Sequence, residues 1–281
     1  LGCEQAADLM KNSTILKNCK INHQWTGIIY ETPTGRQKKA IPGITETTRH
    51  LARLVNESLT QNNETVVIGG DHSCAIGTWS GLYAALSKHH GDKSDIGLIW
   101  VDAHLDAHTP LTSDTGNVHG MPVAHLLGYG DERLKSIYDK HPKINPANLV
   151  FIGSRSFEPA EIKFVQSVGA KVFYQSDVDK LGIEKVLNEA IKIASNKTVG
   201  FGMSIDMDGF DVKDAPAVGT PERGGIVANQ FINALSKANL KNLLLTELVE
   251  FLPRFDKDKR TEQLVVRLIE AIYGNKLSTR N

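Results

Sequence analysis

The stretch Ile96–Asp106, with the sequence IGLIWVDAHLD, decides the fold because an apolar run leads directly into acidic and imidazole side chains. The run Ile96–Val101 contains no charged residue, and such runs are typical of strands buried on both faces of a parallel sheet. In an open parallel sheet, ligands bind beyond the carboxyl ends of the strands. The polar side chains that begin at Asp102 are therefore expected in a binding site.

Other short apolar runs alternate with helical patterns along the rest of the chain. The predicted strands are Thr65–Ile68, Ile96–Val101, Leu149–Ile152, Lys171–Tyr174, Val199–Ile205 and Leu243–Leu248. Helical periodicity is found from about Thr45 to Asn62, over Ile183–Ile193 and over Gln263–Tyr273. This alternation predicts a three-layer α/β/α fold with a mostly parallel central sheet, formed as a single domain by residues 1–281.

The composition of the sequence bears on the partners and the cellular compartment that can be expected. Lys plus Arg and Asp plus Glu both number 32, so the net charge is zero and no nucleic-acid partner is expected. No apolar run approaches the roughly 20 residues that span a bilayer, so no membrane partner is expected. The three widely spaced cysteines, Cys3, Cys19 and Cys74, favour a reducing compartment and predict a cytoplasmic location. The sequence begins at Leu1 without a signal-peptide pattern, and residues upstream of it are expected.

Acidic and histidine residues follow three of the predicted strands. They are His72, then Asp102, His104 and Asp106, and finally Asp206 and Asp208. If the backbone stays extended, the alternating positions share one face. So many carboxylates at one sheet edge would repel one another unless cations were bound. The nitrogen and oxygen ligands suit Mn²⁺, with Co²⁺, Ni²⁺ or Fe²⁺ as rivals, and six of them suggest two metal ions.

Four ordered motifs resemble the ureohydrolases, the family of arginases and agmatinases, and the sequence is most similar to the arginases. The motifs are Gly69–Ser73 (GGDHS), Trp100–Pro110 (WVDAHLDAHTP), Ser204–Asp208 (SIDMD) and Gly219–Gly225 (GTPERGG). The segment Gly2-Cys3-Glu4 also resembles the N-terminal part of the family, whose first strand normally precedes it. The resemblance implies the arginase-like fold, with that first strand missing from the given sequence.

The resemblance also implies a set of metal ligands. One Mn²⁺ would be held by His72, Asp102, Asp106 and Asp206. The other would be held by His104, Asp102, Asp206 and Asp208. A hydroxide bridging the two ions, oriented by Asp106, would attack the guanidinium carbon of the substrate and release urea.

Two catalytic positions outside the metal ligands follow from the same resemblance. His119, in the loop Thr115–Gly120 (TGNVHG), matches the proton shuttle of the family, a task that suits imidazole because its ordinary pKa is near neutrality. Glu250 matches the glutamate that pairs with the substrate guanidinium, and a carboxylate can accept two parallel hydrogen bonds from that group. Thr220 would add a hydroxyl nearby.

Substrate choice is expected to depend on the loops that hold the far end of the substrate. Thr115 and Asn117 match arginase residues that bind the α-carboxylate, and Glu158 lies in a segment that resembles the α-ammonium site. Five positions depart from the pattern, among them His108, which stands where Asn is common, and Glu158, which stands where Asp is common. The others are Thr115, Val212 and Leu252. The predicted reaction is hydrolysis of L-arginine to L-ornithine and urea.

Several alternative functions remain open from the sequence alone. Agmatinase, guanidinobutyrase and formimidoylglutamase belong to the same family, and an inactive metal-binding homologue is an alternative of a different class. A two-metal phosphoesterase is a further possibility, but few Arg or Lys residues lie near the ligands to clamp a phosphate. The resemblance also implies a homo-oligomer, either a trimer or a hexamer.

Overall fold

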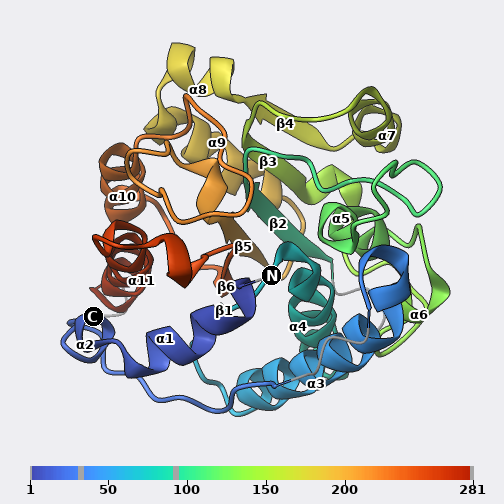
Figure 1. Ribbon diagram of the computed structural model, residues 1–281, viewed down its shortest axis with the longest axis horizontal. Coiled ribbons are helices and arrows are strands. Elements are labelled where there is room, and N and C mark those ends of the chain that lie inside the picture. Colours follow the sequence, from blue (N-terminus) through green and yellow to red (C-terminus); the bar gives the residue numbers. More distant parts are fainter. Residues whose placement is uncertain (1, 31–34, 91–94, 279–281) are drawn as a thin grey trace.

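Six parallel strands form the central sheet of the computed structural model, which describes residues 2–30, 35–90 and 95–278. The strands are β1 (Thr65–Ile68), β2 (Ile96–Val101), β3 (Leu149–Ser154), β4 (Lys171–Tyr174), β5 (Gly200–Asp206) and β6 (Leu243–Val249). Their order across the sheet is β1-β6-β5-β2-β3-β4, and every paired neighbour runs in the same direction. The sheet crosses the middle of the molecule (Figure 1).

The helices cover both faces of this sheet. They are α1 (Ala6–Asn12), α2 (Thr14–Lys17), α3 (Ile41–Thr60), α4 (Ala75–His90), α5 (Pro122–Leu126), α6 (Glu132–Lys135), α7 (Pro159–Val168), α8 (Gln175–Leu181), α9 (Ile183–Ala194), α10 (Ala228–Lys237) and α11 (Arg260–Ser278). Helices α3, α4 and α5 lie on one face, and α9, α10 and α11 lie on the other (Figure 1). The predicted three-layer α/β/α fold is therefore confirmed, with a sheet that is parallel throughout the described strands. Among the described residues, none of the helices is both long enough and apolar enough to cross a membrane.

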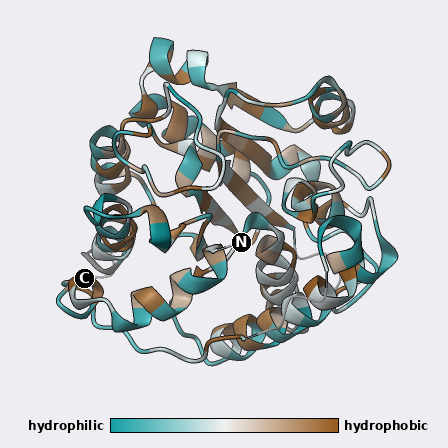
Figure 2. Ribbon diagram, viewed as in Figure 1, coloured by the Kyte–Doolittle hydropathy of each residue, from teal (hydrophilic) through white to brown (hydrophobic). Residues whose placement is uncertain are grey.

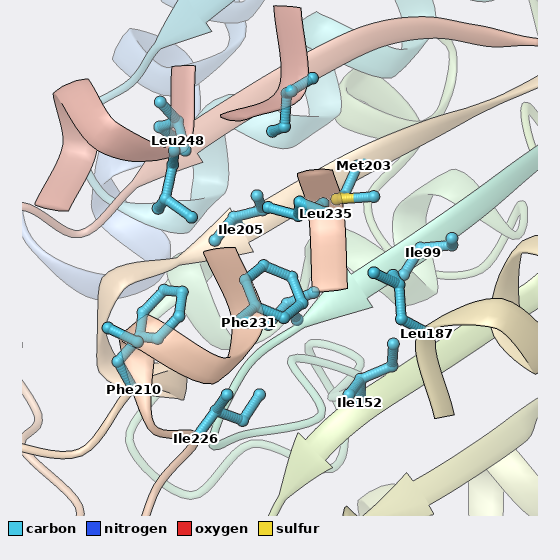
Figure 3. Close-up of a cluster of buried hydrophobic side chains, with 14 of the residues drawn as sticks. Ile99, Ile152, Leu187, Met203, Ile205, Phe210, Ile226, Phe231, Leu235 and Leu248 are labelled. Atoms are coloured by element: carbon cyan, nitrogen blue, oxygen red, sulfur yellow. The ribbon is translucent and has the colours of Figure 1, made fainter. Parts of the chain in front are cut away.

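Alternating strand residues supply two separate apolar cores. Within β2, Ile99 and Val101 pack on the side of α9 and α10, whereas Leu98 and Trp100 pack on the side of α3 and α4. Figure 3 shows the first core, where side chains of β2, β3 and β5 meet those of α9 and α10. Apolar residues concentrate in the sheet, and polar residues dominate the outer faces of the helices (Figure 2).

Two glycines let a helix approach the sheet closely. A Cβ on Gly97 of β2 would lie 1.9 Å from the carbonyl oxygen of Ala194 in α9. A Cβ on Gly202 of β5 would lie 2.0 Å from the ring of Trp79 in α4. Both distances are far below van der Waals contact, so any larger residue would separate the layers. These contacts hold the strands, and with them the segments after the strands, at fixed depth between the helices.

Candidate metal centre

The predicted ligands lie just beyond the carboxyl ends of three strands. His72 begins a 3₁₀ turn, His72–Cys74, that follows β1, and Asp102 directly follows β2. Asp206 is the last residue of β5, and Asp208 lies in the next 3₁₀ turn, Met207–Gly209. Because β6 lies between β1 and β5, and β5 pairs with β2, these ends all face one edge of the sheet.

The expectation that alternating ligands share the face of an extended backbone is wrong in its geometry. Asp106 has a φ of 47°, which is the left-handed region, and Asp208 lies within a 3₁₀ turn. The side chain of Asp206 caps that turn by accepting a hydrogen bond from the amide of Asp208 at 2.7 Å. The backbone after each strand therefore bends, and the bends bring the side chains together.

His72 lies at the centre of the first group of side chains. Its Nδ1 is 3.2 Å from Oδ2 of Asp102, 3.0 Å from Oδ2 of Asp106 and 3.1 Å from Oδ2 of Asp206. This nitrogen is buried and has no hydrogen-bond partner among the described residues. An imidazole nitrogen surrounded by three carboxylate oxygens, but hydrogen-bonded to none, fits a position that faces a cation.

A second group shares Asp102 with the first. Nδ1 of His104 is 3.4 Å from Oδ1 of Asp102 and 3.2 Å from Oδ2 of Asp208. This cluster therefore contains two candidate metal groups, one formed by His72, Asp102 and Asp106 and the other by Asp102, His104 and Asp208. A third candidate group among the described residues is formed by His108, Glu158 and Glu161. Asp206 joins the first group through its contact with His72.

The pKa shifts of the clustered side chains show that negative charge accumulates at this site without enough positive charge to balance it. Burial, and then the charges of Asp208 and Asp102, raise the pKa of Asp206 well above its usual range. Burial also raises the pKa of Asp106 and of Asp208, and the neighbouring Asp102 adds to both shifts. Burial acts against the charged form of His104, but hydrogen bonds to Asp102 and Asp208 raise its pKa to about 12. Asp106, Asp206 and Asp208 hold protons more tightly in this arrangement because the carboxylates are too close to ionise together. Asp102 is the exception, because burial opposes its ionisation but its contacts with His104 and His72 lower its pKa.

Divalent ions fit this donor set. Imidazole nitrogens and carboxylate oxygens, with no thiolate among them, are suited to Mn²⁺ and similar ions. Such ions would replace the protons and remove the repulsion between the carboxylates. The pattern of orphaned imidazole nitrogen, shared carboxylate and raised carboxyl pKa values therefore supports a two-metal centre.

Glu250 lies beside this cluster at the end of β6, in a strained backbone conformation with a φ of 62°. One carboxylate oxygen, Oε1, accepts a hydrogen bond from the amide of His72 at 2.8 Å, and Oε2 accepts one from Sγ of Cys3 at 3.3 Å. Burial, and then the charge of Asp71, raise the pKa of Glu250 to about 7, while His119 opposes the shift. His119 lies in the short 3₁₀ turn Val118–Gly120 and lines the same cavity as Glu250 and the metal cluster.

The residues predicted to bind the far end of the substrate line that cavity too. Nε2 of His108 contacts the carboxylate of Glu158, and Nδ1 lies 3.2 Å from the hydroxyl of Thr112. The hydroxyl of Thr115 is turned toward its own loop, where it accepts a hydrogen bond from the amide of Asn117. The fold therefore brings the predicted residues to one cavity, but the contact between His108 and Glu158 was not predicted.

Thr220, which was expected to place a hydroxyl near the substrate guanidinium, also contacts the carboxylate cluster. Its hydroxyl donates to Oδ2 of Asp208 at 2.9 Å, so it contacts the metal cluster. Gly219 is the neighbouring residue that approaches Glu250, because a Cβ on it would lie 3.8 Å from Oε2. The loop therefore reaches both the carboxylate cluster and Glu250.

Two residues that shape the site were missed in the sequence. The ring of Trp100 stacks on the imidazole of His72, with centroids 4.0 Å apart and planes 9° apart, and its Nε1 donates to Oδ2 of Asp102 at 2.9 Å. The guanidinium of Arg155 donates to the backbone carbonyls of Asp208 at 2.7 Å and Glu222 at 2.9 Å. Trp100 appeared as one more apolar residue of a buried strand, so only its indole N–H could have indicated the role.

Known proteins provide an independent comparison. The Arginase family model matches residues 2–274. The arginase of Brevibacillus brevis is 39% identical over 240 residues, which are 85% of this chain and 78% of that protein. A crystal structure of the arginase from Bacillus subtilis superposes with a TM-score of 0.86 at 33% identity, covering 97% of this chain and 93% of that chain. The arginase of Entamoeba histolytica in complex with L-ornithine gives a TM-score of 0.81 at 26% identity, covering 98% and 93% of the two chains. The chain therefore belongs to the arginase family, and it is a hydrolase of the ureohydrolase class.

Proposed function

We propose that this hydrolase uses two Mn²⁺ ions to convert L-arginine and water to L-ornithine and urea. The observation that carries the proposal is the pair of imidazole–carboxylate groups that share Asp102. Their members His104, Asp106 and Asp208 line the same cavity as Glu250. One ion would be held by His72, Asp102, Asp106 and Asp206, and the other by His104, Asp102, Asp206 and Asp208. Two divalent ions bound there would act as a Lewis acid and would lower the pKa of a water molecule enough to make it a nucleophile.

Glu250 is proposed to bind the guanidinium group of the substrate. Its carboxylate is buried beside the cluster, and an ionised carboxylate can accept two parallel N–H hydrogen bonds from a planar guanidinium. A cationic guanidinium would also favour the ionised form of Glu250, whose pKa is raised to about 7. Binding would thus place the substrate carbon next to the metal cluster.

Proton transfer is assigned to His119. Imidazole can both release and accept a proton near neutral pH, and His119 lies close enough to Glu250 to influence its ionisation. We propose that His119 delivers a proton to the nitrogen of the departing amine. Asp106 would accept a hydrogen bond from the attacking water and fix its orientation.

The far end of the substrate is assigned to the side chains that line the mouth of the cavity. An α-carboxylate would be bound by His108, Thr115 and Asn117, and an α-ammonium by Glu158. The L-ornithine in the structure of the Entamoeba relative carries both of these groups. We also propose that the chain acts as a single domain in the cytoplasm, and its three free thiols support a reducing compartment.

A urea-release assay with a panel of substrates tests this proposal. Protein loaded with Mn²⁺ is expected to release urea from L-arginine at least tenfold faster than from agmatine or guanidinobutyrate, and to leave formimidoylglutamate intact. Metal analysis of the same sample should give two ions per chain. A preference for agmatine would overturn the substrate, and metal binding without any turnover would point to an inactive homologue.

A further inference from the structure

Glu247 is a fully buried acid within β6 that the proposed reaction does not use. Its relative exposure is 0%, and three side chains surround its carboxylate. The hydroxyl of Ser204 donates to Oε2 at 2.7 Å, while Oε1 accepts from the hydroxyl of Thr78 at 2.5 Å and from the thiol of Cys74 at 3.6 Å. An ionised carboxylate can only accept hydrogen bonds, so this environment is built to receive protons from its neighbours.

Ser204 connects this carboxylate to the metal cluster. Its Oγ lies 3.0 Å from Nε2 of His72 as well as 2.7 Å from Glu247. A serine hydroxyl has one proton, and it gives that proton to Glu247. Towards His72 the hydroxyl can therefore only accept, which places a hydrogen on Nε2 of the imidazole.

The consequence appears at the other ring nitrogen of His72. A neutral imidazole that carries its hydrogen on Nε2 has a lone pair on Nδ1, and Nδ1 is the atom that faces Asp102, Asp106 and Asp206. We propose that Glu247 and Ser204 are positioning residues that fix the tautomer and orientation of His72 for metal binding. Stacking by Trp100 holds the plane of the same ring. The proposal rests on the two-metal function, because it concerns how one proposed ligand is presented to its ion.

A simpler role for Glu247 would be structural. A buried acid whose oxygens are all hydrogen-bonded is tolerated in many cores, and then each of its partners would matter for stability alone. The two roles make different predictions for the partners of Glu247. Only the hydrogen bond through Ser204 connects Glu247 to His72, so only the positioning role makes Ser204 matter for metal binding. Thr78 contacts the other carboxylate oxygen and provides a matched control.

The experiment compares Ser204→Ala with Thr78→Val. Both changes remove one hydroxyl from the same carboxylate, but only the first cuts the link to His72. Groups that orient a metal-bound histidine typically contribute 10- to 100-fold to metal affinity. Competition with a chelator is therefore expected to show about that loss for one of the two Mn²⁺ ions in Ser204→Ala, with the other ion affected less. In Thr78→Val both dissociation constants should stay within about threefold of the wild type.

A spectroscopic measurement identifies the atom involved. In protein loaded with the diamagnetic ion Cd²⁺, the Nε2–H proton of His72 should give a downfield NMR signal that exchanges slowly with water. The signal should persist in Thr78→Val and should exchange rapidly or disappear in Ser204→Ala. Assignment follows from its loss in His72→Ala.

A double-mutant comparison separates coupling from general damage. If the two residues act through one path, Glu247→Gln should weaken the ion at His72 in the wild-type background but add little in the Ser204→Ala background. Equal, additive losses would overturn the path, and so would an unchanged Nε2–H signal in Ser204→Ala. Wild-type protein that binds no metal would instead overturn the proposed function. Two ions bound equally well by wild type and Ser204→Ala would overturn the positioning role alone.

Discussion

Asp106 and Glu250 hold the left-handed backbone conformation that non-glycine residues rarely adopt. Each such conformation costs on the order of 1 kcal/mol, so the surrounding structure has to compensate for it. Both residues are acids of the proposed site, and both turn their carboxylates toward His72. Strain at the two positions therefore accompanies the placement of two carboxyl groups against His72, one at its imidazole and the other at its backbone amide.

The raised pKa of Glu250 predicts a pH-dependent stability effect. In the folded, metal-free protein this pKa rises from its ordinary value of 4.5 to about 7, because burial disfavours the carboxylate. Since the folded state holds the proton more tightly than the unfolded state, the stability contributed by protonated Glu250 is present at low pH. It is lost as the pH rises through about 7. Glu250→Gln removes this loss, so its stability relative to wild type should improve with pH by up to about 3 kcal/mol.

Urea-induced unfolding of both metal-free proteins at pH 5 and pH 8.5 measures this effect. The difference between variant and wild type should favour Glu250→Gln more strongly at pH 8.5. A difference that is the same at both pH values would show that Glu250 ionises normally. The same variant should release urea from arginine at least 100-fold more slowly at pH 8.5 when loaded with Mn²⁺, because an amide lacks the charge that binds guanidinium.

His108 predicts a test of substrate recognition. Its imidazole is held by Glu158 and Thr112, in the position assigned to the substrate carboxylate. A hydrogen bond to a charged group contributes about 1.5–3 kcal/mol, which is about 10- to 100-fold in an equilibrium. In His108→Ala, kcat/KM for arginine should fall by that factor, mainly through KM, while the residual rate with agmatine should change less than threefold. Parallel losses with both substrates would contradict the assignment.

Among the secondary-structure elements, the close packing of β2 against α9 depends on one glycine. Gly97→Ala would put a methyl group 1.9 Å from the carbonyl oxygen of Ala194, and relieving that overlap should destabilise the fold by about 3 kcal/mol. Gly274→Ala is the matched control, because it makes the same change in α11 where a Cβ would meet no atom within 4 Å. The control should stabilise the protein by about 0.5–1 kcal/mol. Thermal unfolding compares the two, and equal melting temperatures would contradict the packing argument.

Regular elements were predictable because their patterns are continuous. The strand Ile96–Val101 was predicted with the observed bounds, since it is apolar throughout and ends at Asp102. The helix predicted from about Thr45 begins at Ile41, because a proline in its first turn and a preceding 3₁₀ turn extend it beyond the periodic residues. Boundaries of this kind depend on local turns that hydrophobic periodicity does not register.

The fold brings the predicted members of the candidate site together, but their geometry was not predictable from the sequence. His72 and Asp102 could be named from their places after buried strands, and the fold does bring them together. The turns at Asp106 and Asp208 were not predicted, because an Asp-x-Asp spacing is equally compatible with an extended chain. Glu247 was hidden inside an apolar strand, where its charge was the only sign of a role. Long-range hydrogen bonds such as the one from Ser204 to Glu247 leave no local pattern in the sequence.

For the whole molecule, the metal centre joins segments that are far apart in the chain. His72 follows β1, Asp102 follows β2, and Asp206 ends β5, so ions bound there would connect three of the six strands. Without ions, Asp206 and Asp106 are buried at this sheet edge with raised pKa values, next to the carboxylate of Asp102. Unfolding would release that repulsion, and the folded protein is therefore expected to depend strongly on bound metal.

Removing the metal should lower the melting temperature in proportion to the ions lost. A ligand at 100 times its dissociation constant stabilises the folded state by about 2.7 kcal/mol, so two such ions contribute about 5 kcal/mol. For a chain of this size that corresponds to roughly 10–20 °C in Tm. The rise in Tm that metal produces should fall by about half in His104→Ala, because this variant loses a ligand of one ion. It should be unchanged in His141→Ala, which alters an exposed histidine outside the cluster. Calorimetry with and without a chelator measures each increment. If the chelator left the wild-type Tm unchanged, the carboxylates would have to be stabilised by protons alone, and the two-metal centre would be wrong.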